Sequence, residues 1–428
     1  MNARPQAVKE RRVAAGDGPL LVNGGTIRLA DLPLLPYDEY ADRLLAEVAA
    51  GGRVATAFAA PGEQGLELFA LLARDWQGVL VPLRTRIGDS FPSLTVACPQ
   101  LHLFERELAE QYGVRPEGHP WFKPVRFHLP WQGGDPWGRP AGQHPVPGVM
   151  DYYQVTGDEV HEVAVGPVHA GVIEPGHFRF QCHGENVMHL EISLGYQHRG
   201  IERLLAGGPH PATPFQLEAA AGDTTIGHMS AYTQLLEGLS GAQAPPRAQA
   251  IRAIALELER LANHVGDIGA LAGDVGFLPT ASFCGRLRGD YLNFTAALCG
   301  SRFGRTLVRP GGVAFDLESV LADSLLQKLE PVMRDTRGAL ELFFDTPSVL
   351  ARLEGVGKVT TADAELLGLV GPAGRGCGLV REVRLHHPAD WWCERFDNVI
   401  FEETGDVFAR ANVRRREIAD SLDFLRRT

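Results

Sequence analysis

A compact group of ionisable residues, His198-Arg199-Gly200-Ile201-Glu202, lies where an alternating segment changes to a helical pattern. Titratable side chains gathered at a strand-to-helix junction indicate a functional surface, because binding and catalysis depend on such groups. An exposed helix start with its charges facing water is the alternative that the residue types alone leave open.

A second group of ionisable residues lies within the helical pattern that begins at Pro245-Pro246 and runs to Phe277. Proline suits a helix start because its missing N–H would be unpaired there. An apolar and a polar stripe both recur every three or four residues, so they occupy two faces of one helix. The apolar stripe comprises Ile254, Leu258, Leu261, Val265, Ile268, Ala272 and Val275, and the polar stripe Glu257, Arg260, His264, Asp267 and Asp274. The helix is therefore either half exposed, or its polar row is buried and conducts protons or sets a redox site.

The N-terminal third has the pattern of a small α+β domain. Apolar spacing predicts a helix over 37–50 and strands over 54–60 and 78–87, with a helix over 67–75 between them. Ten of the twenty-one residues 129–149 are Gly or Pro, which excludes a helix or a central strand there. We expect domains over 1–128 and 150–428, joined by a linker over 129–149.

The second domain should be mainly helical with a small β-rich edge. Phe178, Phe180, Val187, Leu190 and Ile192 alternate around the turn residues 183–186, a pattern typical of a β-hairpin. Helices are expected over 215–238, 318–344 and 362–368. The predicted fold class is α+β.

Composition excludes several functions. A net charge of −11 disfavours nucleic acid as a partner. We find neither an apolar run of the ~20 residues that a membrane-spanning helix needs nor a secretory signal at the start. The six cysteines form no CxxC pair, and no GxGxxG follows a strand. Local motifs thus indicate neither a metal cluster nor a dinucleotide site.

Five short motifs stand in order: GPxH at 166–169, EPGHF at 174–178, GENV at 184–187, LGYxHRGIE at 194–202 and GDVFARANVRRRE at 405–417. Together they resemble the large subunit of energy-converting, membrane-bound (group 4) [NiFe] hydrogenases and its relative, the 49-kDa protein of respiratory complex I. Further matches to this family are Arg286, Gly300, Arg302 and Gly311-Gly312-Val313.

The segment 91–127, with Glu105-Arg106-Glu107, Gly113 and Gly118-His119-Pro120, resembles the 30-kDa protein of complex I. The resemblance implies that this segment docks on the large subunit. Because Glu105 and Glu107 cannot share one helix face, one of them could meet a partner while the other meets water.

The hydrogenase resemblance implies four cysteines that hold nickel and iron, since these metals need soft thiolate ligands. The first pair falls on Ala221 and Thr224, although the histidine that follows is present as His228. The second pair would lie beyond Thr428. We therefore predict that a Ni-Fe centre is absent. Glu202 matches the family's magnesium ligand, so magnesium at Glu202 stays possible.

The complex I resemblance implies a quinone site. His169 matches, but the second histidine of that motif is replaced by Ile173 and the quinone-binding tyrosine by Gly222, whereas Asp274 matches the aspartate. Direct quinone chemistry is therefore disfavoured. The remaining polar constellation comprises His198, Arg199, Glu202, Asp223, His228, Arg260, His264 and Asp274. We hypothesise that Asp223, His228 and Asp274 are redox-inactive remnants that now serve proton transfer or conformational coupling.

The resemblance implies a peripheral-arm subunit of a complex I-related or hydrogenase-like oxidoreductase, bound to the cytoplasmic side of the inner membrane. Its expected partners are a small iron–sulfur subunit and antiporter-like membrane subunits. A quinone-reducing subunit of the NADH dehydrogenase type and a catalytically inactive assembly scaffold stay open as alternatives. Whether the chain is itself an enzyme is left open.

Overall fold

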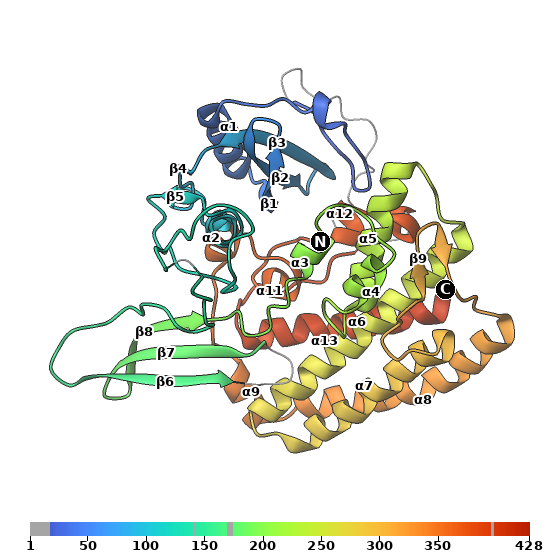
Figure 1. Cartoon of the computed structure of the whole chain (residues 1–428). Coiled ribbons are helices and arrows are strands. Elements are labelled where there is room, and N and C mark those ends of the chain that lie inside the picture. Colours follow the sequence, from blue (N-terminus) through green and yellow to red (C-terminus); the bar gives the residue numbers. More distant parts are fainter. Residues whose placement is uncertain (1–17, 141, 169–173, 395–397) are drawn as a thin grey trace.

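The computed structural model describes residues 18–140, 142–168, 174–394 and 398–428 (Figure 1). The N-terminal part combines α1 (Tyr37–Ala49) with an antiparallel sheet in the order β1 (Arg53–Gly62), β2 (Gly65–Arg74), β3 (Val79–Ile87). Next come α2 (His102–Tyr112) and a parallel pair, β4 (Ser90–Pro92) with β5 (Arg115–Glu117). The core between the sheet and the helices contains Tyr40, Leu44, Leu72 and Leu108.

The predicted helix over 67–75 is wrong, because this segment forms β2, the central strand of the sheet. Leu68, Ala70 and Leu72 are buried at every second position, which is the period of a strand. The segment is rich in residues that favour a helix, but ladders on both sides pair its backbone and override that preference.

A second sheet extends away from the rest of the molecule (Figure 1). Its strands are β6 (Val160–Val168), β7 (Gly176–His183) and β8 (Asn186–Ser193), all antiparallel. The predicted hairpin is confirmed as β7 and β8, with Gly184-Glu185 at the turn. The connection over 129–149 contains neither helix nor strand among its described residues.

The helical part begins with α3 (Ile201–Leu205), α4 (Thr213–Glu218), α5 (Thr225–Ser240) and the long α6 (Pro246–Asp274). Then come α7 (Leu278–Cys299), the two-residue strands β9 (Val308–Arg309) and β10 (Gly312–Val313), α8 (Ser319–Phe344) and α9 (Pro347–Leu353). The chain continues through α10 (Thr361–Leu366), α11 (Gly371–Arg375) and α12 (Val383–His386) to α13 (Val407–Arg427). Short 3₁₀ turns occur at Leu29–Asp31, Pro99–Leu101 and Asp390–Glu394.

The core of this part lies along α6, α7, α8 and α13, which pack against one another (Figure 1). Leu261, Val265, Ile268 and Ala272 of the predicted apolar stripe are buried in it. Within the described residues, no helix combines the length and the apolar character that crossing a membrane requires. Small sheets together with this bundle confirm the α+β class.

The predicted helix over 215–238 is interrupted. Residues 219–224 form a loop between α4 and α5, because side chains elsewhere bind its backbone. Arg199 Nη2 donates to the carbonyl of Ala220 over 2.6 Å, and Asn263 Nδ2 donates to that of Asp223 over 3.0 Å. This loop, called the 219–224 loop below, contains Ala221 and Thr224, the positions that lack the family's cysteines.

Candidate functional site

The 219–224 loop ends where α5 begins, and Glu259 of α6 binds that helix start. Its carboxyl oxygens accept the backbone N–H groups of Ile226 (2.7 Å) and Gly227 (3.0 Å). Burial raises the pKa of Glu259 to about 7; the two N–H groups lower it, and the nearby Asp223 raises it further. Glu259 can therefore hold or release a proton near neutral pH.

Sequence reasoning missed Glu259. It lies outside the polar stripe of α6, one position before Arg260 and two after Glu257. A signal was available, because a carboxylate on the apolar side of a helix needs a partner when it is buried. Its partner is the start of α5, which the unbroken helix predicted over 215–238 did not contain.

The predicted residues around position 200 lie close to the 219–224 loop. Arg199 joins this group to the loop through Ala220. His198 stacks on His128 with ring centroids 5.0 Å apart. Burial, together with the neighbouring His128 and Arg126, lowers the pKa of His198 to about 4, so that its imidazole is neutral at pH 7.

Two of the three residues hypothesised as proton-transfer remnants lie in the 219–224 loop or beside it. Asp223 is exposed and lies 3.7 Å from Arg288 Nη2, and His228 Nδ1 lies 2.8 Å from the carbonyl oxygen of Thr224. Asp274 is exposed at the C-terminal end of α6, eleven residues after Asn263, which contacts the loop. At ~1.5 Å per residue, that is roughly 16 Å along the helix. The structure does not bring Asp274 to the loop.

The polar stripe of α6 is buried in its first half. Glu257 and His264 are 1% and 8% exposed, so a half-exposed helix does not describe this region. His264 Nε2 lies 2.7 Å from Glu417 of α13, and Arg260 lies 3.1 Å from the same carboxylate. Farther along, Asp267 pairs with Arg414 at 2.8 Å and Asp274 is exposed.

Glu417 is the centre of this buried group. Burial alone would raise its pKa, but the hydrogen bond from His264 and the charges of Arg260 and Arg375 outweigh burial and hold the pKa of Glu417 well below its usual range. Burial lowers the pKa of His264. A second part of the network contains Arg384, which binds Glu257 (2.8 Å) and Glu382 (3.0 Å).

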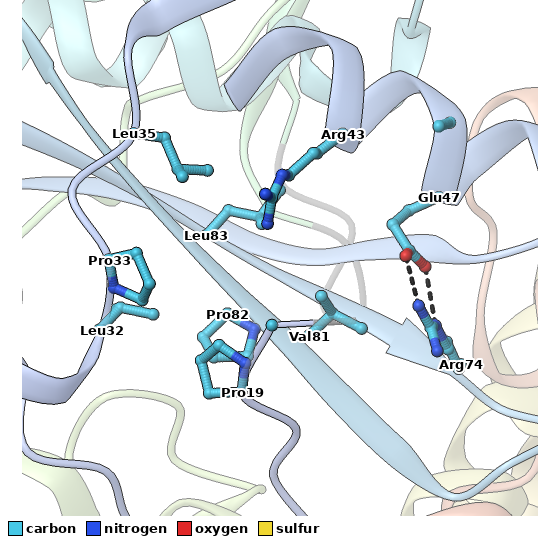
Figure 2. A pocket seen from close by; sticks show the side chains of 12 residues that line it. Pro19, Leu32, Pro33, Leu35, Arg43, Glu47, Arg74, Val81, Pro82 and Leu83 are labelled. Atoms are coloured by element: carbon cyan, nitrogen blue, oxygen red, sulfur yellow. Dashed lines mark hydrogen bonds and ion pairs between the residues drawn. The ribbon is translucent and has the colours of Figure 1, made fainter. Parts of the chain in front are cut away.

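A cavity of about 540 Å³ opens beside this network. Its wall includes Thr224 of the loop, the Glu259–His264 face of α6, segment 381–387 around α12, and Arg53 and Asp75 of the N-terminal part. A smaller cavity of about 200 Å³ lies between α1, β3 and residues 18–35. In that one, Glu47 and Arg74 already bind each other (Figure 2), and it holds no predicted site residue. The larger cavity is the candidate site.

The residues present do not fit a Ni-Fe centre. Ala221 and Thr224 carry no thiolate, and across the described residues no three His, Cys, Asp or Glu side chains are placed to hold a metal ion. Glu202, the predicted magnesium ligand, instead pairs with Arg126 at 3.1 Å. We derive no chemical step through either metal. His169 and Ile173 of the quinone motif lie outside the described residues.

Two family models match the chain. Residues 43–140 match the 30 Kd subunit of respiratory-chain NADH dehydrogenase, and residues 274–428 match its 49 Kd subunit. The carbon monoxide-induced hydrogenase of Rhodospirillum rubrum is 33% identical over 273 residues, which cover 62% of this chain and 74% of that protein. The chain belongs to the family of complex I 49-kDa subunits and membrane-bound hydrogenase large subunits. Its resemblance to that family, with a 30-kDa-like N-terminal part, is confirmed.

For some relatives the match spans less than two thirds of their length. Formate hydrogenlyase subunit 5 of Escherichia coli (strain K12) is 32% identical over 359 residues, or 78% of this chain, but the match spans only 61% of that protein. Among solved structures, the membrane-bound sulfane sulfur reductase, an archaeal respiratory membrane complex, matches with a TM-score of 0.59 and 24% identity. This match covers 64% of this chain and 73% of that one, and it shows the shared fold alone.

Proposed function

We propose that this chain is a peripheral-arm subunit of a complex I-related, membrane-associated oxidoreductase complex. In this proposal it couples electron transfer to ion translocation without a Ni-Fe centre of its own. The observation that carries the proposal is the 219–224 loop, which has alanine and threonine where the family's thiolates would be. Arg199 and Asn263 nevertheless bind its backbone, and Glu259 binds the helix start that follows it. Membership of a family whose named relatives include a hydrogenase and a formate hydrogenlyase subunit supports it.

The ionisable groups beside the loop would perform the coupling. Glu259 has a pKa of about 7 and lines the same cavity as His264 and Arg260. A carboxyl group that can be protonated or ionised at neutral pH suits proton transfer. Asp223, in the loop, and His228, in the first turn of α5, remain in the proposal, whereas Asp274 lies away from the loop.

The proposed partners are a small iron–sulfur subunit and antiporter-like membrane subunits, with attachment on the cytoplasmic side of the inner membrane. Relatives named as membrane-bound hydrogenase and as a subunit of formate hydrogenlyase support a multi-subunit setting. The described helices supply no span of their own, so membrane attachment would come through such partners.

A non-catalytic scaffold is the second candidate. One observation favours it: much of the buried charge forms closed ion pairs, such as Glu417 with Arg375 at 2.9 Å and His264 at 2.7 Å. Groups bound in this way stabilise a fold without moving protons.

Purification of the tagged chain from detergent-solubilised membranes tests the proposal. We expect an iron–sulfur subunit and a multi-span membrane subunit to co-purify in equal amounts with the chain. The double variant Asp223→Asn/His228→Ala should assemble normally but lose most of the dye-linked electron transfer of the complex. Recovery of the chain alone from the soluble fraction would refute the subunit role, and unchanged activity of the variant would favour the scaffold.

A further inference from the structure

Three basic side chains share one carboxylate where the N-terminal part meets the helical part. Asp75 follows β2, and its oxygens lie 3.2 Å from Arg53 Nε, 3.6 Å from Arg381 Nε and 2.8 Å from His387 Nε2. Arg53 belongs to β1, whereas Arg381 and His387 flank α12. All four residues line the cavity of about 540 Å³.

Arg381 lacks full compensation for its charge. Its guanidinium has five N–H donors, but among the described residues it makes one hydrogen bond, from Nη1 to the carbonyl of Leu369 at 3.3 Å, besides the long contact with Asp75. Burial lowers the pKa of Arg381, with the nearby Arg53 acting in the same direction against the attraction of Asp75 and Glu365. A further anion would find unused donors here.

His387 supplies the second, independent observation. The residue is 5% exposed, and its Nδ1 is buried with no hydrogen-bond partner within the described residues. Because Nε2 lies 2.8 Å from the Asp75 carboxylate, Nε2 donates to it. In the imidazolium form both ring nitrogens carry a hydrogen, so Nδ1 would then donate to a second anion. Buried polar atoms in proteins are nearly always paired, so this one points to a missing partner in the cavity.

The other carboxylates near α12 are already used. Glu257 and Glu382 both bind Arg384, at 2.8 Å and 3.0 Å. Asp75 is therefore the carboxylate that contacts Arg53, Arg381 and His387, while Glu365 attracts Arg381 from farther away, and the contacting groups on this side of the cavity carry a net positive charge. The wall also includes the apolar residues Leu256, Val370 and Val383.

We propose that this cavity binds a small organic acid, whose carboxylate is held by Arg381 and His387 and whose apolar body contacts Leu256, Val370 and Val383. The volume lies in the range of sites for small molecules, ~300–1,000 Å³. Arginine binds carboxylates through paired N–H groups, so the chemistry fits the donors that are unused. The ligand would contact both parts of the chain at once, with Arg53 on one side and the residues that flank α12 on the other.

Isothermal titration of the full-length chain with benzoate tests the proposal. We expect saturable binding of one benzoate per chain. Arg381→Gln should weaken it by about tenfold, equal to ~1.4 kcal/mol, which is the size of one lost charge-assisted hydrogen bond. The matched control is Arg28→Gln, which removes an exposed arginine paired with Asp31 and should leave the affinity unchanged.

A second measurement does not depend on any variant. In wild-type chain labelled with ¹⁵N-histidine, benzoate should shift the imidazole signal of His387 while the exposed His183 stays unchanged. The proposal is overturned if wild-type chain shows no saturable binding, if Arg381→Gln binds as tightly as Arg28→Gln, or if the His387 signal does not respond.

Discussion

At the scale of single residues, Glu259 is the group whose protonation the fold controls most clearly. Its carboxyl accepts two amides at the start of α5, yet burial raises its pKa from 4.5 to about 7. The fold therefore favours the neutral acid. The stability that this preference contributes is complete below pH 4.5 and is lost as the pH rises through about 7.

Replacement of Glu259 by glutamine removes this pH dependence. A pKa rise of 2.5 at ~1.4 kcal/mol per unit corresponds to about 3 kcal/mol. Between pH 5 and pH 8, the free energy of unfolding of the wild type should thus fall by up to about 3 kcal/mol relative to Glu259→Gln. Urea denaturation at several pH values measures this difference. If the free energy of unfolding of the two proteins changed with pH in parallel, the raised pKa of Glu259 would be contradicted.

Glu417 affects the pH dependence of stability in the opposite direction to Glu259. Its pKa is held low, so its contribution to stability is present above pH 4.5 and is lost as the pH falls. Glu417→Gln leaves Arg260 and Arg375 buried without their counter-charge and should cost about 3–5 kcal/mol at pH 7. The control Glu330→Gln breaks the exposed pair with Arg426 and should cost no more than about 1 kcal/mol. Equal unfolding midpoints for both variants would show that Glu417 is not the centre of the network.

The sequence could predict which residues of α6 are ionisable, but not which partners they meet. Glu257, Arg260 and His264 were found by helical spacing, because spacing is a local property. Arg375, Arg384 and Glu417 lie more than 100 residues away in the chain, and no local pattern connects them to α6. The choice between an exposed and a buried row therefore needed the structure.

At the scale of elements, α2 binds residues 123–127, the segment that leads out of the N-terminal part. Arg106 donates to the carbonyls of Lys123 (2.7 Å) and Pro124 (3.0 Å). Glu110, fully buried, accepts the N–H groups of Arg126 (2.8 Å) and Phe127 (2.7 Å). All of these contacts lie within the segment 91–127 itself. Glu105, which was expected to meet either a partner or water, is buried and accepts hydrogen bonds from Leu94 and Thr95 at 2.7 Å each.

Glu110→Ala should release segment 123–127. Two buried backbone N–H groups lose their acceptor, which should lower the free energy of unfolding by about 1–3 kcal/mol for each group. Trypsin should then cleave after Arg126 much faster than in the wild type. Glu117→Ala, at the exposed pair with Arg115, serves as the control and should leave cleavage unchanged. If both variants resist trypsin as the wild type does, α2 is not what holds the segment.

Helices and strands were predicted correctly where the apolar residues recur with one clear period. The predictions were wrong where contacts with residues distant in the sequence determine the local structure. The helices over 37–50 and 318–344 and the hairpin around 183–186 are confirmed by α1, α8, and β7 with β8. Residues 67–75 became a strand because β1 and β3 flank them, and the start of α5 moved to Thr225 because Glu259 binds there. Both causes lie outside the local windows that sequence reasoning uses.

At the scale of the whole molecule, the short motifs around positions 166–202 and 405–417 allowed the family to be predicted, and the expected helices and strands allowed the α+β class to be predicted, before any contact was known. Motifs cannot show a cavity, however. The site between Thr224, α6 and α12 contains residues from both parts of the chain. Asp75 and His387, which pair in its wall, lie 312 residues apart in the sequence. The domain limits at 128 and 150 remain predictions.

The central proposal is that this chain has no Ni-Fe centre of its own. The most direct test is the nickel and iron content of the complex purified from membranes, with a [NiFe] hydrogenase large subunit treated in the same way as a positive control. We predict iron from an iron–sulfur partner and nickel no higher than in a mock preparation, because Ala221 and Thr224 offer no thiolate. Nickel in equal amount to the chain would contradict the account.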